Sequence, residues 1–256
     1  MIAMAIGIPP GERGASLQTV AVAIICKTPM PGQSKTRLSP PLHPEECAAL
    51  SACFIQDLSQ TIGSLEHDGD VSGYAVNTPL GSEHDLRQLV PPGFGLVPQA
   101  SGDLGARLLR GVVDLLARGH SGAILVNSDS PTLPRAILRD AVDAVRLGDN
   151  VTLSPALDGG YTLVGLSHPH ARLFADIPWS TDAVYDLTLR RAREIGLPVA
   201  TVPGWYDVDD ASSFRMLEDE LTGRPPSFAA AGALGAAAHA TRRFLRQRSS
   251  ALAGSA

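Results

Sequence analysis

Residues Val20-Ala21-Val22-Ala23-Ile24-Ile25-Cys26-Lys27-Thr28-Pro29-Met30-Pro31-Gly32-Gln33-Ser34-Lys35-Thr36-Arg37-Leu38 join a short apolar run to a loop that is rich in proline, glycine and cations. An apolar run bounded by turn residues predicts a buried strand. Similar runs alternate along the chain with segments whose apolar residues recur at helical spacing, a pattern typical of successive βαβ units. The sequence therefore predicts an α/β fold with a mainly parallel central sheet flanked by helices.

The expected elements are placed from apolar spacing and from the turn residues around them. Strands are expected at residues 20–26, 71–77, 94–97, 122–127, 151–155, 161–166 and 199–202. Helices are expected at residues 45–62, 103–118, 134–147 and 181–195, with another around Phe214. Both ends of the chain are rich in Gly, Pro, Ala and Ser, so we expect tails at residues 1–18 and 223–256 and one domain at residues 19–222.

The composition is that of a soluble globular protein, with 44% hydrophobic and 18% charged residues in a chain of 256. No apolar run approaches the roughly 20 residues of a membrane helix, and the N-terminus lacks the features of a signal peptide. We therefore expect a cytoplasmic protein without a membrane partner. The sequence gives no indication of oligomeric state.

Charge is unevenly distributed along the chain. The net charge is −5, yet the segment after Thr222 holds five arginines and no acid. Such a segment could contact an anionic surface, but its Ala, Gly and Ser content favours a frayed or flexible end. We therefore expect a flexible C-terminal tail and no nucleic-acid partner.

Cysteine usage argues against a disulfide framework or a zinc site. The three cysteines, Cys26, Cys47 and Cys53, are odd in number and show no CxxC spacing. We interpret them as small buried apolar residues.

Both lysines of the chain lie in the loop after the first expected strand, and elsewhere the positive charge comes from arginine. A lysine ammonium binds phosphate as a point charge, whereas a guanidinium prefers a planar, forked contact. The loop is therefore a candidate phosphate site, with a solvated basic turn as the alternative. No GxGxxG or P-loop motif is present, so a site of another kind is expected. Its candidate residues are Lys27, Pro31, Gly32, Lys35, Thr36 and Arg37.

Ligands of open α/β sheets bind beyond the carboxyl ends of the strands, so polar residues at those ends are candidates. Asp129 follows the most apolar expected strand. Magnesium takes one or two carboxylates together with phosphate oxygens and water, which makes Asp129 a candidate metal ligand. The alternative is a turn and cap before the helix that starts near Pro134.

Two later acidic motifs also lie near expected strand ends. Asp158-Gly159-Gly160-Tyr161 could approach a ligand closely through its glycines, or could simply form a hairpin turn. Trp205-Tyr206-Asp207-Val208-Asp209-Asp210 offers three carboxylates before a helix. We expect Asp210 or Asp209 to cap that helix, which leaves Asp207 or Asp209 as a second metal ligand.

Two further motifs have ordinary structural explanations. Gly102-Asp103-Leu104-Gly105-Ala106-Arg107 lies at an expected helix start, where backbone N–H groups attract anions, but Asp103 could be a simple cap. Pro178-Trp179-Ser180-Thr181-Asp182 could likewise hold a cap at Ser180 or Thr181 and a packed Trp179. The histidines are scattered, and nothing supports a catalytic triad.

Taken together, these motifs resemble the radical-SAM/selenodomain-associated transferase family, within the GT-A-like nucleotide-diphospho-sugar transferases. The resemblance covers residues 20–221, with the motifs in order. It implies a single Rossmann-like GT-A domain that binds a nucleotide and a divalent metal, Mg²⁺ or Mn²⁺. The loop motif from Lys27 to Leu38 and the motif Asp207-Val208-Asp209 also resemble the phospholactate guanylyltransferases. One departure is Asn127-Ser128-Asp129, which lacks a full DxD.

The combined hypothesis is a metal-dependent transferase with a nucleotide or nucleotide-sugar donor and a small-molecule acceptor. The leading reaction is glycosyl transfer; nucleotidyl transfer with pyrophosphate release is the alternative, and non-catalytic nucleotide binding is a third. The catalytic candidates are Lys35, Asp129 and Asp158, and the metal candidates are Asp129, Asp207 and Asp209. Further nucleotide-binding candidates are Gly102, Asp103 and Arg107. The substrate-binding candidates are Asp158, Gly159, Gly160, Tyr161, Trp179, Ser180 and Thr181.

Overall fold

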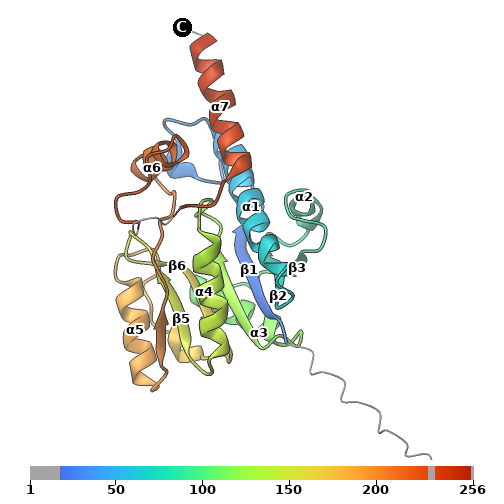
Figure 1. Ribbon diagram of the computed structural model, residues 1–256, viewed down its shortest axis with the longest axis vertical. Coiled ribbons are helices and arrows are strands. Elements are labelled where there is room, and N and C mark those ends of the chain that lie inside the picture. The colour runs from blue at the N-terminus through green and yellow to red at the C-terminus, as the bar shows by residue number, and fades with distance from the viewer. Residues whose placement is uncertain (1–17, 230–233, 255–256) are drawn as a thin grey trace, which may run out of the picture.

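A seven-stranded mixed sheet forms the centre of the protein in a computed structural model that describes residues 18–229 and 234–254 (Figure 1). Its strands are β1 (Val20–Lys27), β2 (Val71–Thr78), β3 (Gly95–Pro98), β4 (Gly122–Asn127), β5 (Val151–Pro155), β6 (Tyr161–Leu166) and β7 (Val199–Thr201). Their order in the sheet is β3-β2-β1-β4-β6-β5-β7. Only β6 runs against its neighbours, pairing antiparallel with β4 and β5. The expected α/β fold with a mainly parallel sheet is confirmed.

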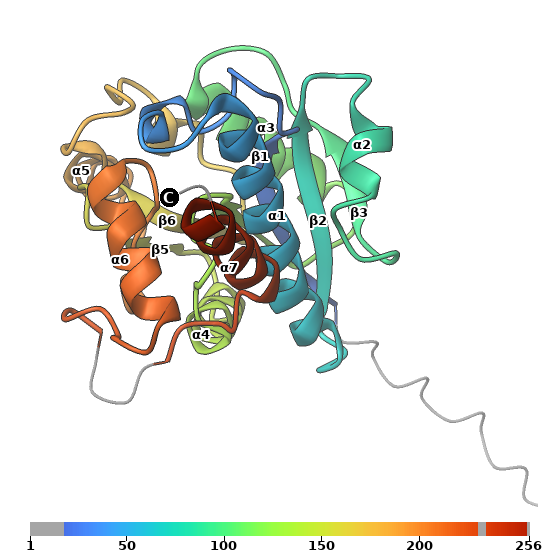
Figure 2. The same ribbon diagram turned by 90° about the horizontal axis from the view of Figure 1, so that it is seen from above.

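Helices cover both faces of the sheet (Figures 1 and 2). They are α1 (Pro44–Glu66), α2 (Glu83–Arg87), α3 (Leu104–Leu116), α4 (Arg135–Arg146), α5 (Val184–Glu194), α6 (Ala211–Leu221) and α7 (His239–Gly254), with 3₁₀ turns η1 (Thr36–Leu38) and η2 (Ala171–Phe174). Alternate residues of β1 enter two separate cores, because side chains of a strand point to opposite faces. Val22 and Ile24 pack with α1 and α4, whereas Ala21 and Ala23 pack with α3. Strand β1 is therefore buried on both faces, as its apolar run predicts.

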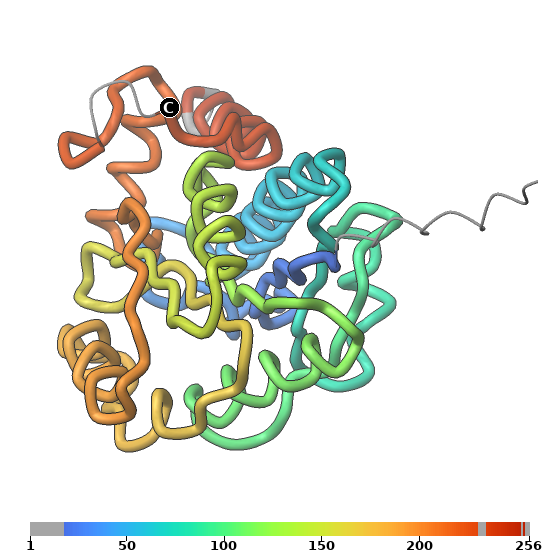
Figure 3. Tube along the Cα trace, turned by 60° about the horizontal axis from the view of Figure 1, so that its bottom comes forward, coloured from blue at the N-terminus to red at the C-terminus, as the bar shows by residue number. Residues whose placement is uncertain are grey.

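Several helices differ from the sequence expectation: α1 ends at Glu66 instead of residue 62, and α2 was not expected. The helix expected from residue 181 begins at Val184, because Ser180 has a left-handed backbone (φ 67°) and the following segment packs against the β5–β6 turn. In addition, residues 239–254, expected within a flexible tail, form α7. Figures 1 to 3 show α7 lying beside α1. The proposed domain boundary at residue 222 stays a prediction.

The start of α7 is held by a carboxylate of α1. Asp57, which is 3% exposed, accepts hydrogen bonds from the backbone N–H groups of Ala240 and Thr241, both at 2.8 Å. Free N–H groups of a first helical turn need acceptors, and a buried acid on a neighbouring helix supplies them here. Farther along α7, Arg248 pairs with Glu46 at 3.3 Å.

We expect Asp57→Ala to lower the free energy of unfolding by about 2 kcal/mol, since it removes the cap and leaves two buried donors unpaired. Urea unfolding followed by circular dichroism measures this loss. Asp140→Ala, at an exposed site on α4, is the matched control and should change stability by less than about 0.5 kcal/mol. Equal stability of the two variants would show that Asp57 does not hold α7.

Among the described helices, none combines the length and the apolar character that a membrane crossing needs.

The carboxyl ends of the central strands meet at one edge of the sheet. Lys27 at the end of β1 lies opposite Thr78 of β2, and Ile25 lies opposite Asn127 at the end of β4. This is the edge at which ligands bind in open α/β sheets. The loops after β1 and β4 therefore meet there.

Candidate functional site

The loop after β1 folds back on itself before α1. Gly32 has a left-handed backbone (φ 70°), which glycine adopts without strain, and Lys35 is also left-handed (φ 49°). The Ser34 hydroxyl accepts a hydrogen bond from the Met30 N–H at 3.0 Å. Exposed Lys27 donates to the Gln33 side chain at 2.9 Å. These bonds hold the loop in a tight turn that directs Lys35 inward.

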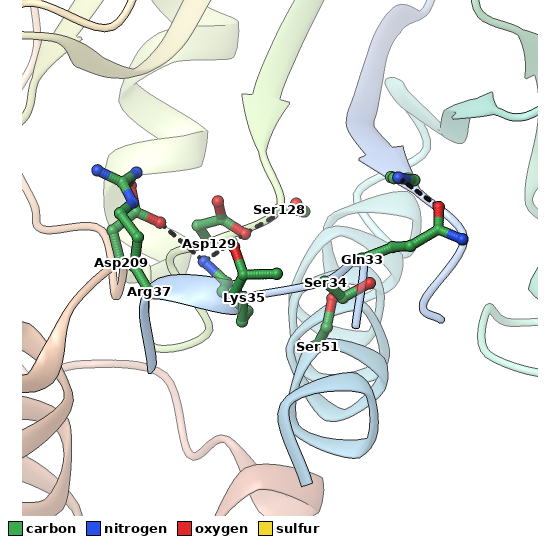
Figure 4. Close-up of a pocket in the computed structure, with 10 residues that line it drawn as sticks. Gln33, Ser34, Lys35, Arg37, Ser51, Ser128, Asp129 and Asp209 are labelled. Atoms are coloured by element: carbon green, nitrogen blue, oxygen red, sulfur yellow. Dashed lines mark hydrogen bonds and ion pairs between the residues drawn. The ribbon is translucent and has the colours of Figure 1, made fainter. Parts of the chain in front are cut away.

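The Lys35 ammonium lies between two carboxylates from distant parts of the chain (Figure 4). Its Nζ is 2.8 Å from Asp129 Oδ1 and 2.9 Å from Asp209 Oδ1. It also donates to the Val208 carbonyl oxygen at 2.7 Å, and the side chain is only 6% exposed. Burial alone would lower the pKa of Lys35, but the two carboxylates outweigh it and raise that pKa. Lys35 is therefore a fixed, buried positive charge.

Arg37 adds a second cation on the solvent side of this cluster. Its Nη2 lies 3.1 Å from Asp209 Oδ2, and its side chain is 74% exposed. Although burial opposes ionisation of Asp209, Lys35 and Arg37 hold the pKa of this carboxyl below its usual value. Asp209 is therefore ionised at neutral pH.

Asp207 has a different environment. It accepts a short hydrogen bond from the Ser130 hydroxyl. Burial, together with the neighbouring carboxylates Asp129, Asp209 and Asp158, raises the pKa of Asp207 to about 7, although the Ser130 hydrogen bond opposes this shift. Two carboxylates neutralised by cations thus lie beside a third that resists ionisation.

This raised pKa makes folding stability depend on pH. The folded state holds the Asp207 proton more tightly than the unfolded state. The stability that wild type gains from this protonated side chain is therefore lost as pH rises from about 4 to about 7. We expect Asp207→Asn, measured in EDTA, to be more stable relative to wild type at pH 8 than at pH 4, by roughly 1.4 kcal/mol or more. Thermal unfolding at the two pH values measures this, and Asp140→Asn should show no such difference. A pH-independent effect of Asp207→Asn would contradict the raised pKa.

Two pockets adjoin the Lys35 cluster. The first, here called the loop pocket, has a volume of about 250 Å³. The second, here called the hairpin pocket, has a volume of about 300 Å³ and reaches the turn between β5 and β6. The loop pocket is lined by Lys27, Gln33, Ser34, Lys35, Thr36, Arg37, Ser51, Ser128, Asp129 and Asp209. The hairpin pocket is lined by Arg37, Leu104, Leu108, Asn127, Asp129, Asp158, Gly160, Tyr161, Trp179, Ser180, Thr181, Asp182, Val184, Asp207 and Asp209.

The structure thus brings most of the expected site residues together. Four expected phosphate ligands line the loop pocket: Lys27, Lys35, Thr36 and Arg37. All expected substrate residues except Gly159 line the hairpin pocket, and Gly159 instead packs against the backbone of Asp182, where a Cβ would lie 2.2 Å from the Asp182 carbonyl oxygen. Pro31 and Gly32 share the β1 loop but line neither pocket.

The remaining three candidates have structural positions of their own. Asp103 caps α3, accepting from the Ala106 N–H at 2.8 Å, and Arg107 donates to the Gln99 side chain at 2.9 Å. Together with Gly102, they line neither pocket. Gly105 of the same motif has a structural role: a Cβ at this position would lie 2.9 Å from the Trp179 ring, so only glycine leaves room for that ring. Trp179 therefore packs against the start of α3.

Several lining residues were not expected from the sequence. Ser51 lies on α1 and lines the loop pocket. Asp182, the last residue of the candidate motif that contains Trp179, lines the hairpin pocket although it was not among the expected substrate residues. Gln33, Ser34 and Ser128 adjoin expected residues, so proximity in sequence could have indicated them. Ser51 carries no such signal, because only the packing of α1 brings it to the loop pocket.

The expected metal ligands fit a hard cation in their chemistry. Asp129, Asp207 and Asp209 offer only oxygen donors, which Mg²⁺ and Mn²⁺ favour. Burial and, to a smaller extent, repulsion from the other carboxylates raise the pKa of Asp207. Among the described residues, however, no three His, Cys, Asp or Glu side chains are arranged to hold a metal ion. Lys35 already supplies a positive charge between two of the three. A metal would therefore have to share or replace the Lys35 contacts.

Comparison with protein families and solved structures gives the following similarities. Residues 61–181 match the family described as an uncharacterized protein conserved in bacteria (DUF2064). No curated protein matches the sequence. A crystal structure from Desulfovibrio desulfuricans G20, provisionally assigned as a nucleotide-diphospho-sugar transferase, is 25% identical with a TM-score of 0.75, and the match covers 90% of this chain and 95% of that one.

More distant structures share the fold alone. A CMP:2-keto-3-deoxy-manno-octonic acid synthetase complexed with CTP is 10% identical with a TM-score of 0.52, covering 80% of this chain and 98% of that one. The 4-diphosphocytidyl-2C-methyl-D-erythritol synthase of Anaerococcus prevotii DSM 20548 is 8% identical with a TM-score of 0.51, covering 80% and 99%. The fold is thus that of nucleotide-diphospho-sugar transferases and cytidylyltransferases, and it resembles nucleotide-dependent transferases in general.

Proposed function

We propose that the protein is a nucleotide-dependent transferase that moves a sugar from a nucleoside diphosphate sugar to a small acceptor. One observation carries the proposal: the cations of the β1 loop and the carboxylates Asp129 and Asp209 line one pocket at the carboxyl edge of the sheet. Ligands of open α/β sheets bind at this edge. The similarity to the D. desulfuricans structure supports the same class of donor.

In this proposal the diphosphate lies in the loop pocket against Lys27, Lys35 and Arg37. Fixed cations at this position offset the negative charge that builds up on the departing diphosphate. Such electrostatic stabilisation of the transition state is usually the largest contribution to catalysis. Lys35 is especially suited, because its burial and its three oxygen contacts fix its position before the reaction. Pro31, Gly32, Gly102, Asp103 and Arg107 would then shape or flank the nucleotide site without lining the loop pocket.

Mg²⁺ or Mn²⁺ would be held by Asp129 together with Asp207 or Asp209, and when bound it would add positive charge beside the diphosphate. The sugar and acceptor would lie in the hairpin pocket, which shares Asp129, Asp209 and Arg37 with the loop pocket. Asp158 reaches this pocket from the β5–β6 turn, where it accepts from the Gly160 N–H at 2.9 Å. We assign Asp158 to contact the acceptor hydroxyl or to take its proton.

Nucleotidyl transfer from a nucleoside triphosphate is the second candidate. The three cations of the loop pocket suit a triphosphate as well as a diphosphate, and the fold shared with the CTP-complexed synthetase agrees with it. Attack would then occur at the α-phosphorus, with pyrophosphate as the leaving group.

Product analysis tests the proposal. The purified protein is incubated with Mg²⁺ or Mn²⁺, a panel of nucleoside diphosphate sugars or triphosphates, and an acceptor mixture. Release of nucleoside diphosphate supports glycosyl transfer, and release of pyrophosphate supports nucleotidyl transfer. Nucleotide binding without either product would leave only a non-catalytic binding protein.

A further inference from the structure

Charge is segregated between the two pockets. The loop pocket is lined by three cations, Lys27, Lys35 and Arg37, with two carboxylates. The hairpin pocket is lined by a single cation, Arg37, and by five carboxylates. These are Asp129, Asp158, Asp182, Asp207 and Asp209. A bound molecule that spans both pockets therefore meets positive charge at one end and negative charge at the other.

The single cation of the hairpin pocket, Arg37, is shared with the loop pocket. Arg37 pairs with Asp209 at 3.1 Å, and Lys35, on the other side of Asp209, contacts Asp129 and Asp209. Among the residues that line the hairpin pocket, no second cation faces a group held near Asp158 and Asp182. A phosphate there would lie against carboxylates, and placing like charges together in a binding site is strongly unfavourable.

The wall of the hairpin pocket is apolar and aromatic. It includes Trp179 and Tyr161 together with Leu104, Leu108 and Val184. Trp179 is seated on Gly105, and its indole N–H is buried without a hydrogen-bond partner in the described part of the chain.

An aromatic wall facing carboxylates suits one class of ligand. The C–H faces of a sugar ring pack on aromatic rings, while its hydroxyl groups donate to carboxylates such as Asp158 and Asp182. Neither contact uses a negative charge on the ligand. The exposed carboxylates Asp158 and Asp182 would also accept the hydrogen bonds of an amino group.

We propose that the hairpin pocket accepts a phosphate-free saccharide, neutral or amine-bearing, and rejects its phosphorylated counterpart. The inference rests on the proposed function for the role of this saccharide as acceptor. It narrows that function, because the carboxylates of Asp158 and Asp182 disfavour a phosphorylated acceptor.

Ligand-observed NMR on the purified full chain tests the proposal with matched probes: glucose, glucosamine and glucose 6-phosphate. Inorganic pyrophosphate with Mg²⁺ is present in excess, so that the loop pocket is blocked and cannot bind the phosphate of the third probe. We expect glucose and glucosamine to bind at least about tenfold more tightly than glucose 6-phosphate. Equal or tighter binding of glucose 6-phosphate would overturn the proposal, as would binding of none of the three.

A double variant, Asp158→Asn with Asp182→Asn, should weaken glucose binding and reduce the discrimination against glucose 6-phosphate. Asp140→Asn should behave like wild type. Discrimination that is unchanged in the double variant would also overturn the proposal. Nucleotide binding is measured separately: if it fails while the sugar preference holds, the proposed function falls alone, and if it succeeds while the preference fails, only this inference falls.

Discussion

Lys35→Met is expected to lower kcat/KM at least about a hundredfold, since it removes the buried cation closest to the proposed diphosphate. It should also lower the free energy of unfolding by about 2 kcal/mol, because Asp129 and Asp209 lose their shared partner. The loss is smaller than for a fully buried ion pair, because both carboxylates are about one-third exposed. Binding of Mn²⁺ without nucleotide, followed by electron paramagnetic resonance, should become tighter, because the ammonium no longer competes for these carboxylates.

Lys27→Met is the matched control for this prediction. Lys27 is exposed and its ammonium donates to the Gln33 side chain, so its loss should leave stability and Mn²⁺ binding nearly unchanged. Lys35→Arg should still be damaging, because a guanidinium does not fit a site where three oxygens lie 2.7 to 2.9 Å from a single nitrogen. Kinetics of Lys35→Arg close to wild type would contradict the importance we give to lysine at this position.

Asp129→Asn should reduce the metal-stimulated rate by more than about tenfold, or about 1.4 kcal/mol in activation free energy. The substitution keeps the shape of the side chain but removes one of the two charges that face Lys35 and would face a metal. The backbone hydrogen bond from the Val208 N–H to the Asp129 carbonyl oxygen, 2.9 Å long, does not involve the side chain, so the loop after β4 should keep its position.

Rates measured across a Mn²⁺ titration test this second prediction, with Asp140→Asn as the control for a remote carboxylate. A rate within tenfold of wild type, with an unchanged Mn²⁺ dependence, would remove Asp129 from the metal site.

The fold could be predicted from the sequence because its signals are local. The apolar run of β1 is buried on both faces. Asp210, one of the two residues expected to cap α6, accepts hydrogen bonds from the N–H groups of Ser212 and Ser213. The Asp158-Gly159 pair also forms the turn between β5 and β6. Each of these features depends on residues close together in sequence.

The site could be predicted only in part, because its decisive contacts join distant segments. The sequence indicated Lys35 as a phosphate ligand and Asp129 and Asp209 as metal ligands, but not that the three would contact one another. Likewise, nothing local links Gly105 to Trp179, or Asp57 to the start of α7. Such pairs are set by how helices and loops pack on the sheet, and a single sequence carries no direct signal for them.

The most direct test of the central claim is a thermal-shift measurement of nucleoside diphosphate sugars, each with and without Mg²⁺, on wild type and on Lys35→Met. A ligand at about 100 times its Kd adds roughly 2.7 kcal/mol, which corresponds to several degrees. Wild type should show a metal-dependent shift with at least one donor, and Lys35→Met should lose that shift. A shift that persists in Lys35→Met, or no shift with any nucleotide, would contradict nucleotide binding at the β1 loop.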